Sequence, residues 1–139
     1  MDVTSHKSSI HTLIHLTTLS IVTLSFIENN LNSSMYHWLF PLTSNRLVHL
    51  YLSRNKLDNI PKYLGNLCSL TSLYFDRNSV PVKFPIFLNH LSGCTSLMLR
   101  RLYASSSHFT GSLSNDIQKF SSLQSLDLSN NQLNGTISI

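Results

Sequence analysis

The chain has 139 residues and a mass of 15.7 kDa, which suits a single domain, and its 42% content of hydrophobic residues excludes a disordered tail. Only 12% of the residues are charged, and the ten Lys and Arg residues behind the net charge of +4 are scattered, which argues against a nucleic-acid-binding protein. No run approaches the about 20 consecutive apolar residues that a membrane-spanning helix requires, so no membrane segment is expected in this chain.

Residues 1–15 are predicted to form a frayed N-terminal segment ahead of the domain. The first nine residues are polar and offer no core side chain. The stretch 10–24 that follows is interrupted by His and Thr and merges into the repeats described below. The sequence therefore shows no convincing signal peptide.

Histidines in this segment have the spacing of a metal-binding helix but not its chemistry. His11 and His15 lie four residues apart with His6 nearby, yet Thr12 stands where the HExxH motif of zinc hydrolases has its Glu. Ser, His and Asp all occur in the chain, but no nucleophile elbow accompanies them. We therefore predict no metal site, no cofactor and no catalytic residue.

A pattern of leucines recurs along the chain and is clearest in residues 123–137. Leu126 and Leu128 alternate with polar residues, as in a short strand with one buried face. Asn131 follows where the strand ends, and its side-chain amide can satisfy backbone groups in the bend. Gly135 allows backbone angles that other residues avoid. A unit this small cannot bury its apolar face alone, so it requires similar neighbours.

Matching registers begin at four earlier positions, which gives about five repeats. Their starts are Ile21, Leu47, Leu70, Leu99 and Leu123, with spacings of 26, 23, 29 and 24 residues. We predict an α/β repeat fold over residues 16–139, a right-handed leucine-rich-repeat solenoid with a concave parallel sheet and convex irregular or 3₁₀ segments. No capping sequence follows the fifth repeat, so the domain is expected to be uncapped, with exposed strand edges and apolar ends.

Three features qualify this pattern. Ser107 replaces the turn Asn of the fourth repeat, which should therefore stack less regularly. Pro61 and Pro85 open two segments between strands, which favours irregular or short 3₁₀ backbone there. Residues 32–46 form a longer interval whose apolar side chains are available to cover the convex side, and Trp38 within it is interpreted as a packing residue.

Cys68 and Cys94 lie about one repeat apart. Two states remain open for them. A disulfide between neighbouring repeats is compatible with this spacing if the compartment is oxidising, and two buried thiols are the alternative.

Equivalent strand positions stack above one another in successive repeats, so the register maps the concave surface. One column contains Ser25, Tyr51, Tyr74, Tyr103 and Asp127. Aromatic rings edged by cations suit an extended peptide, bound through stacking and charged hydrogen bonds. The alternative is that the tyrosines only stabilise neighbouring strands. The predicted ligand-binding residues are Tyr51, Tyr74, Tyr103, Arg54, Arg77, Arg101, His49 and Asp76.

The repeats resemble the plant-type extracellular leucine-rich repeats of receptor-like proteins and receptor-like kinases. The resemblance rests on IPKYLGNL at 60–67, NLCSL at 66–70, FxGxL at 109–113 and LxGxI at 133–137. It implies a non-enzymatic module that recognises a peptide or protein ligand, together with a co-receptor, in defence or developmental signalling. It also implies a plasma-membrane or extracellular location within a membrane-anchored parent protein. Kinase motifs are absent from this chain.

Two other functions are consistent with the same repeats. One is an inhibitor of an extracellular enzyme such as polygalacturonase, and the other is a non-functional remnant of a truncated receptor gene. Export would expose the sequons that begin at Asn32 and Asn134 to glycosylation. Short sequons also arise by chance in a chain rich in Ser and Asn, so their meaning depends on the compartment.

Overall fold

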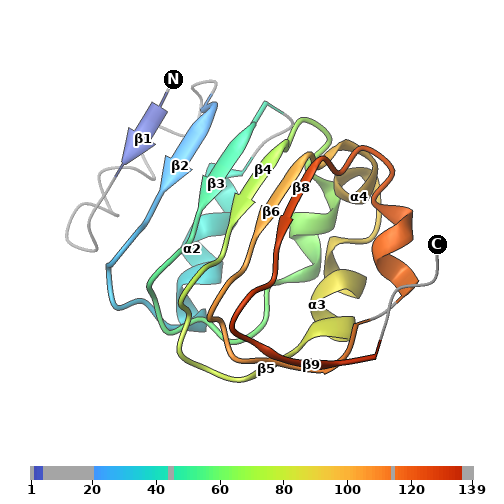
Figure 1. Ribbon diagram of the computed structural model, residues 1–139. Coiled ribbons are helices and arrows are strands. Elements are labelled where there is room, and N and C mark those ends of the chain that lie inside the picture. The colour runs from blue at the N-terminus through green and yellow to red at the C-terminus, as the bar shows by residue number, and fades with distance from the viewer. Residues whose placement is uncertain (1, 5–20, 44–45, 114, 136–139) are drawn as a thin grey trace.

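The computed structural model describes residues 2–4, 21–43, 46–113 and 115–135. A large parallel sheet forms one layer, short helices form a second layer behind it, and a smaller parallel sheet lies along one edge (Figure 1). This recurring order of strand and helix fits the predicted α/β repeat fold.

The large sheet contains six parallel strands of three residues each. In spatial order they are β1 (Asp2–Thr4), β2 (Thr23–Ser25), β3 (His49–Tyr51), β4 (Ser72–Tyr74), β6 (Arg101–Tyr103) and β8 (Ser125–Asp127). The last five fall in the five predicted repeats. β1 adds a strand that the sequence did not suggest, because backbone pairing along the edge of β2 needs no apolar side chain. The other residues of the segment 1–15 lie outside the described part of the chain.

The middle residues of β2, β3, β4 and β6 point into the core. Leu24, Leu50, Leu73 and Leu102 are fully buried and stand opposite one another in register. Leu126 continues this row in β8. The leucines of successive repeats therefore share one continuous core, as the spacing predicted.

A second, three-stranded sheet was not predicted. It contains β5 (Val82–Lys83), β7 (Phe109–Ser112) and β9 (Gln132–Asn134). Gly111 and Gly135 have φ of 88° and 87°, values that L side chains rarely adopt. The glycines therefore permit the turn away from the large sheet, and the residues around them pair with the neighbouring repeat.

The layer behind the sheet is more helical than expected. It contains the 3₁₀ helices η2 (Ser33–Met35), η3 (Phe40–Leu42), η4 (Lys62–Asn66) and η5 (Asn115–Lys119), and the α-helices α2 (Tyr36–Leu39), α3 (Phe84–Leu91) and α4 (Cys94–Met98). The expectation of irregular or 3₁₀ backbone holds after Pro61, where η4 begins, and is wrong for α3.

α3 forms because its proline lies in the first turn, where no intrahelical hydrogen bond from the backbone nitrogen is needed. Phe84, Phe87, Leu88 and Leu91 have the spacing of one helical face and are all buried. Phe84 and Phe87 pack against Phe109 with ring centroids 5.3 and 4.8 Å apart. The longest interval between repeat starts thus contains two α-helices, α3 and α4, which accommodate its extra residues.

The apolar side chains of the segment 32–46 were expected to cover the core, and most of them do. Met35, Leu39 and Leu42 are buried. Trp38 packs edge-on against Phe26, with ring centroids 5.3 Å apart, in agreement with a packing role. Phe40 instead is largely exposed.

Asparagines join the turns of neighbouring repeats. The Oδ1 atom of Asn55 accepts hydrogen bonds from the backbone N–H groups of Asn29 and Leu31, at 3.1 and 3.0 Å. Its Nδ2 atom donates to the carbonyl oxygens of Phe26 and Leu52, at 2.8 and 3.1 Å. Asn55 thereby satisfies buried backbone groups of its own repeat and of the preceding one, and Asn78 and Asn131 do the same in the next turns.

Ser107 does not disturb the stacking, contrary to expectation. Its Oγ atom donates to the carbonyl oxygen of Phe75 at 2.6 Å, as an asparagine amide would. The Oδ1 atom of Asn131 accepts from the N–H groups of Ser107 and Phe109, both at 3.0 Å. The strands on both sides of β6 consequently remain in register.

A disulfide joins Cys68, after η4, to Cys94, at the start of α4. The two Cα atoms lie 5.0 Å apart, within the usual range for such bonds. It crosslinks two consecutive segments of the helical layer.

None of the helices in the described residues has the length and hydrophobicity needed to cross a membrane.

Candidate ligand-binding face

Three tyrosines form a ladder on the outer face of the large sheet. The register places Tyr51 opposite Tyr74 and Tyr74 opposite Tyr103. The rings of Tyr51 and Tyr74 are stacked, with centroids 4.3 Å apart and planes 7° from parallel. The centroids of Tyr74 and Tyr103 are 5.0 Å apart and their planes are tilted by 32°. All three side chains are half-buried.

This geometry limits how the ladder can contact a ligand. Both faces of the Tyr74 ring lie against neighbouring tyrosines, so a ligand meets its edge and hydroxyl group. A tyrosine hydroxyl is protonated at neutral pH and can donate a hydrogen bond there. Burial, followed by the proximity of Tyr51, raises the pKa of Tyr74 above its ordinary value and extends this state to higher pH. Hydrogen bonding and edge contact thus replace most of the stacking that the sequence suggested for the central ring.

A second column follows the strands and has an unusual backbone. Glu28, Arg54, Arg77, Ser106 and Asn130 occupy equivalent positions with φ of 63°, 60°, 61°, 52° and 58°. This left-handed region is uncommon for residues other than glycine and asparagine. Arg54 and Arg77 were predicted on this face, but their backbone conformation was not. Asn130, in the fifth repeat, could have indicated this conformation, because asparagine adopts a positive φ more readily than most residues.

An open groove of about 570 Å³ lies between the tyrosine ladder and this second column. Its lining residues are Ile27, Glu28, Tyr51, Ser53, Arg54, Tyr74, Asp76, Arg77 and Ser105. Ile27 is 39% exposed and is the aliphatic member of the set. The groove therefore combines an apolar end, ring edges and charged groups.

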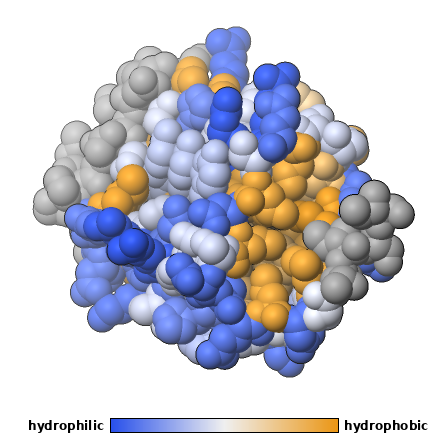
Figure 2. Space-filling view, in the orientation of Figure 1, coloured by the Kyte–Doolittle hydropathy of each residue, from blue (hydrophilic) through white to orange (hydrophobic). Residues whose placement is uncertain are grey.

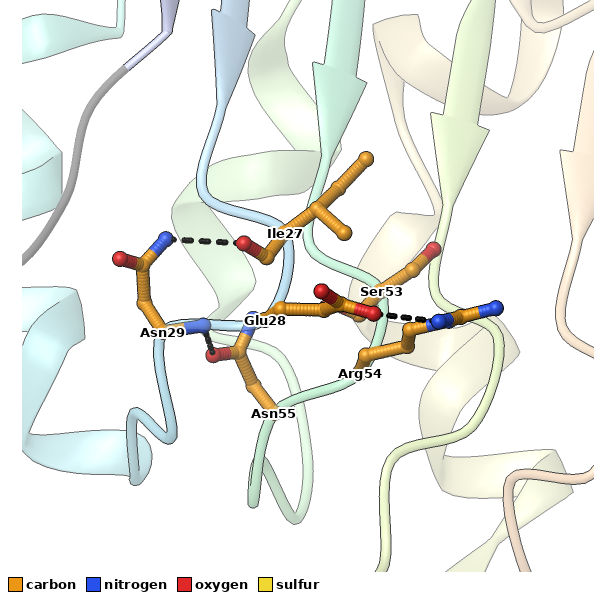
Figure 3. Close-up of polar contacts among 6 residues, drawn as sticks. All are labelled: Ile27, Glu28, Asn29, Ser53, Arg54 and Asn55. Carbon is orange, nitrogen blue, oxygen red and sulfur yellow. Dashed lines mark hydrogen bonds and ion pairs between the residues drawn. The ribbon is translucent and has the colours of Figure 1, made fainter.

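The charged groups of the groove differ in their partners. The carboxylate of Glu28 forms an ion pair with the guanidinium of Arg54 (Figure 3). The Oδ1 atom of Asp76 accepts a hydrogen bond from the N–H group of Ser105 at 3.0 Å. Burial raises the pKa of Asp76, although that hydrogen bond acts in the opposite direction. The guanidinium of Arg77 forms no hydrogen bond or ion pair with another described residue, although the backbone N–H group of Arg77 donates to the carbonyl oxygen of Ser105 at 2.9 Å.

The structure divides the predicted ligand-binding residues into two groups. Five of them line the groove: Tyr51, Tyr74, Arg54, Arg77 and Asp76. The other three, Tyr103, Arg101 and His49, lie on the same sheet outside it. Ile27, Glu28, Ser53 and Ser105 also line the groove and were not among the predicted residues, although the repeat register places them in the adjoining columns.

His49 and Arg101 belong to one column of the large sheet, with Ser72 between them, and this column lies outside the groove. The Nη1 atom of Arg101 lies 3.5 Å from the hydroxyl oxygen of Ser72. The Nδ1 atom of His49 is buried without a hydrogen-bond partner among the described residues. Neither side chain completes the groove.

Both predicted glycosylation residues are exposed. Asn32 caps η2, where its Oδ1 atom accepts hydrogen bonds from the N–H and hydroxyl groups of Ser34 at 3.0 and 2.6 Å. Asn134 ends the edge strand β9.

Within the described ranges, no three His, Cys, Asp or Glu residues are placed to hold a metal ion. His6, His11 and His15 lie outside those ranges.

Comparison with known proteins identifies the repeat. The family model for the Leucine Rich Repeat matches residues 46–67 and 122–139. No curated protein matches the chain. Leucine-rich repeats generally mediate protein–protein recognition, and they are typically binding modules rather than enzymes. The two matched segments, in the second and fifth units of the pattern, are leucine-rich repeats.

Proposed function

We propose that this chain is a non-enzymatic recognition module that binds a peptide or protein ligand across its large sheet. In this proposal the repeats form a right-handed solenoid within the ectodomain of a plant receptor-like protein or receptor-like kinase. The parent protein is membrane-anchored, and the ligand complex recruits a co-receptor in defence or developmental signalling.

The observation that carries the proposal is the groove beside the tyrosine ladder. A tyrosine ladder that served only to stabilise the strands would need no hollow beside it. Here two of the rings line a groove that also contains an exposed isoleucine and charged side chains. Aromatic rings, arginine and a small apolar contact are the groups that recur in protein recognition sites.

Several features support an extracellular location for the proposed receptor. The disulfide between Cys68 and Cys94 would persist in an oxidising compartment. Asn32 and Asn134 are exposed, as glycan acceptors must be. We therefore propose both asparagines as glycosylation sites of the exported protein.

Selection of peptides against the folded protein tests the proposal. The library displays linear peptides of about ten residues, whose extended length exceeds the distance across the strands that border the groove. We expect enrichment of peptides whose binding falls more than about tenfold in the double variant Tyr51→Ser/Tyr74→Ser. Absence of any enriched peptide, or unchanged affinity in the double variant, would refute the proposed function.

The control is Phe40→Ser, which removes an exposed aromatic ring from the helical layer. It should leave peptide affinity unchanged. Circular dichroism and the urea midpoint of each variant establish that the repeats remain folded.

A further inference from the structure

We propose that Arg77 recognises a carboxylate of an acidic peptide ligand, whereas Arg54, at the same position one repeat earlier, is held by Glu28. This inference rests on the proposed function and adds two statements to it: the chemical class of the ligand, and a division of roles between two equivalent arginines.

The backbone cannot account for any difference between the two arginines. Arg54 and Arg77 follow adjacent strands and have φ of 60° and 61°. Both are exposed and both line the groove. Their surroundings must therefore decide which of them is available to a ligand.

The surroundings differ in the acidic residue that lies beside each arginine and in how that residue is engaged. Glu28, at the equivalent position of the preceding repeat, pairs with Arg54 (Figure 3). On the other side of Arg77 the equivalent position is Ser106, which carries no charge. Asp76 lies next to Arg77 and interacts with it electrostatically, but its Oδ1 atom is hydrogen-bonded to the backbone of Ser105. Among the described residues, the guanidinium of Arg77 has no ion-pair partner.

A carboxylate is the group that best complements this arginine. The planar guanidinium can donate two parallel hydrogen bonds to a carboxylate, which adds both strength and orientation. The ring edges of Tyr74 and Tyr51 exclude part of the water from the groove, which strengthens such a bond. The net charge of +4 also favours the approach of an acidic peptide.

The groove also fixes a spacing in the ligand. Ile27 follows β2 and Arg77 follows β4, so two strand spacings, or about 10 Å, separate them. An extended peptide covers that distance in about three residues. A ligand that contacts both residues should carry its acidic residue about three positions from an apolar one.

The test uses the peptides enriched from the displayed library and measures their affinity for five variants. Asparagine replaces each arginine because it tolerates a positive φ, which preserves the fold. We expect Arg77→Asn to lower affinity about tenfold and Arg54→Asn to lower it less than about threefold. Glu28→Gln should raise affinity about threefold because it frees a second guanidinium. Ser106→Asn is the matched control and should leave affinity unchanged.

Each outcome bears on the inference. Equal losses in Arg54→Asn and Arg77→Asn, or a loss in Glu28→Gln, would overturn it. Enriched peptides without acidic residues would also overturn it while leaving the proposed function in place. If no peptide is enriched, the proposed function fails and the inference fails with it. Arg77→Lys provides a second variant at the same position, and it should recover only part of the affinity because an ammonium group cannot form the paired hydrogen bonds.

Discussion

The third and fifth repeats have nearly the same strand pattern, yet their leucines have different surroundings. Leu73 of the third repeat is 0% exposed, whereas the equivalent Leu126 of the fifth is 38% exposed. Figure 2 shows a broad hydrophobic area on the β8 side of the molecule. Leu97 and Met98 in the helical layer are also exposed. The comparison teaches that the neighbouring repeats, rather than the repeat itself, bury a repeat's apolar face.

The largest expected effect is a difference between two identical substitutions. Leu73→Ala should lower the free energy of unfolding by about 3–4 kcal/mol, because it leaves a cavity between packed repeats. Leu126→Ala should cost about 1 kcal/mol, since its side chain already contacts solvent. Urea denaturation of both variants measures the difference. Equal losses would show that burial does not depend on neighbouring repeats as we describe.

The turn asparagines provide a second, smaller contrast. Asn55→Ala should lower the free energy of unfolding by about 2–3 kcal/mol, because it leaves buried backbone groups of two repeats without partners. Asn131→Ala should cost about 1–2 kcal/mol, since its bonds lie in a less buried turn. The same denaturation experiment compares them. A greater loss at Asn131 would contradict the contrast.

A gain is expected where a repeat departs from the asparagine pattern. Ser107→Asn should raise the free energy of unfolding by about 1 kcal/mol, because the longer amide keeps the bond to Phe75 and adds an acceptor for the preceding repeat. A rise in the urea midpoint would support this account. A fall would show that the buried site is too small for an amide, as overpacking predicts.

The smallest expected effect concerns two aspartates in the same two repeats. Burial raises the pKa of Asp76 above its ordinary value of 3.8, whereas hydrogen bonds from Ser129 lower the pKa of Asp127 below it. The folded state therefore holds the proton of Asp76 more tightly than the unfolded state, and stability falls as pH rises through that pKa. For Asp127 the sign is opposite, and stability is lost as pH falls through its lowered pKa. Carboxyl titration by NMR should give Asp76 a higher pKa than Asp127; the reverse order would contradict the burial assigned to Asp76 and the hydrogen bonds assigned to Asp127.

Much of the fold could be predicted because the leucine spacing reports which positions are shared between repeats. The strand registers, the tyrosine ladder and the turn asparagine all follow from that spacing. The second sheet could not be predicted, since its strands are short and their pairing depends on where each repeat turns. α3 was missed because Pro85 reads as a helix breaker unless its position in the first turn is known.

The candidate site was predicted less completely than the fold. Repeat spacing places Arg54 and Arg77 side by side, but it does not show that Glu28 reaches only the first of them. The repeat spacing also does not show which residues line the groove. Their placement depends on the positive φ of the residues that follow each strand. Side-chain pairing and local backbone conformation are set in three dimensions, so the sequence alone left Tyr103, Arg101 and His49 in the predicted set.

Amide chemical-shift mapping with an enriched peptide tests most directly whether the interior repeats form the recognition face. Our account predicts that the shifted N–H signals cluster at Ser53, Arg77 and Ser105, around the groove. The signals of residues 123–135 should move little. Shifts that cluster instead around the exposed Leu126 of the fifth repeat or on the helical layer would contradict it.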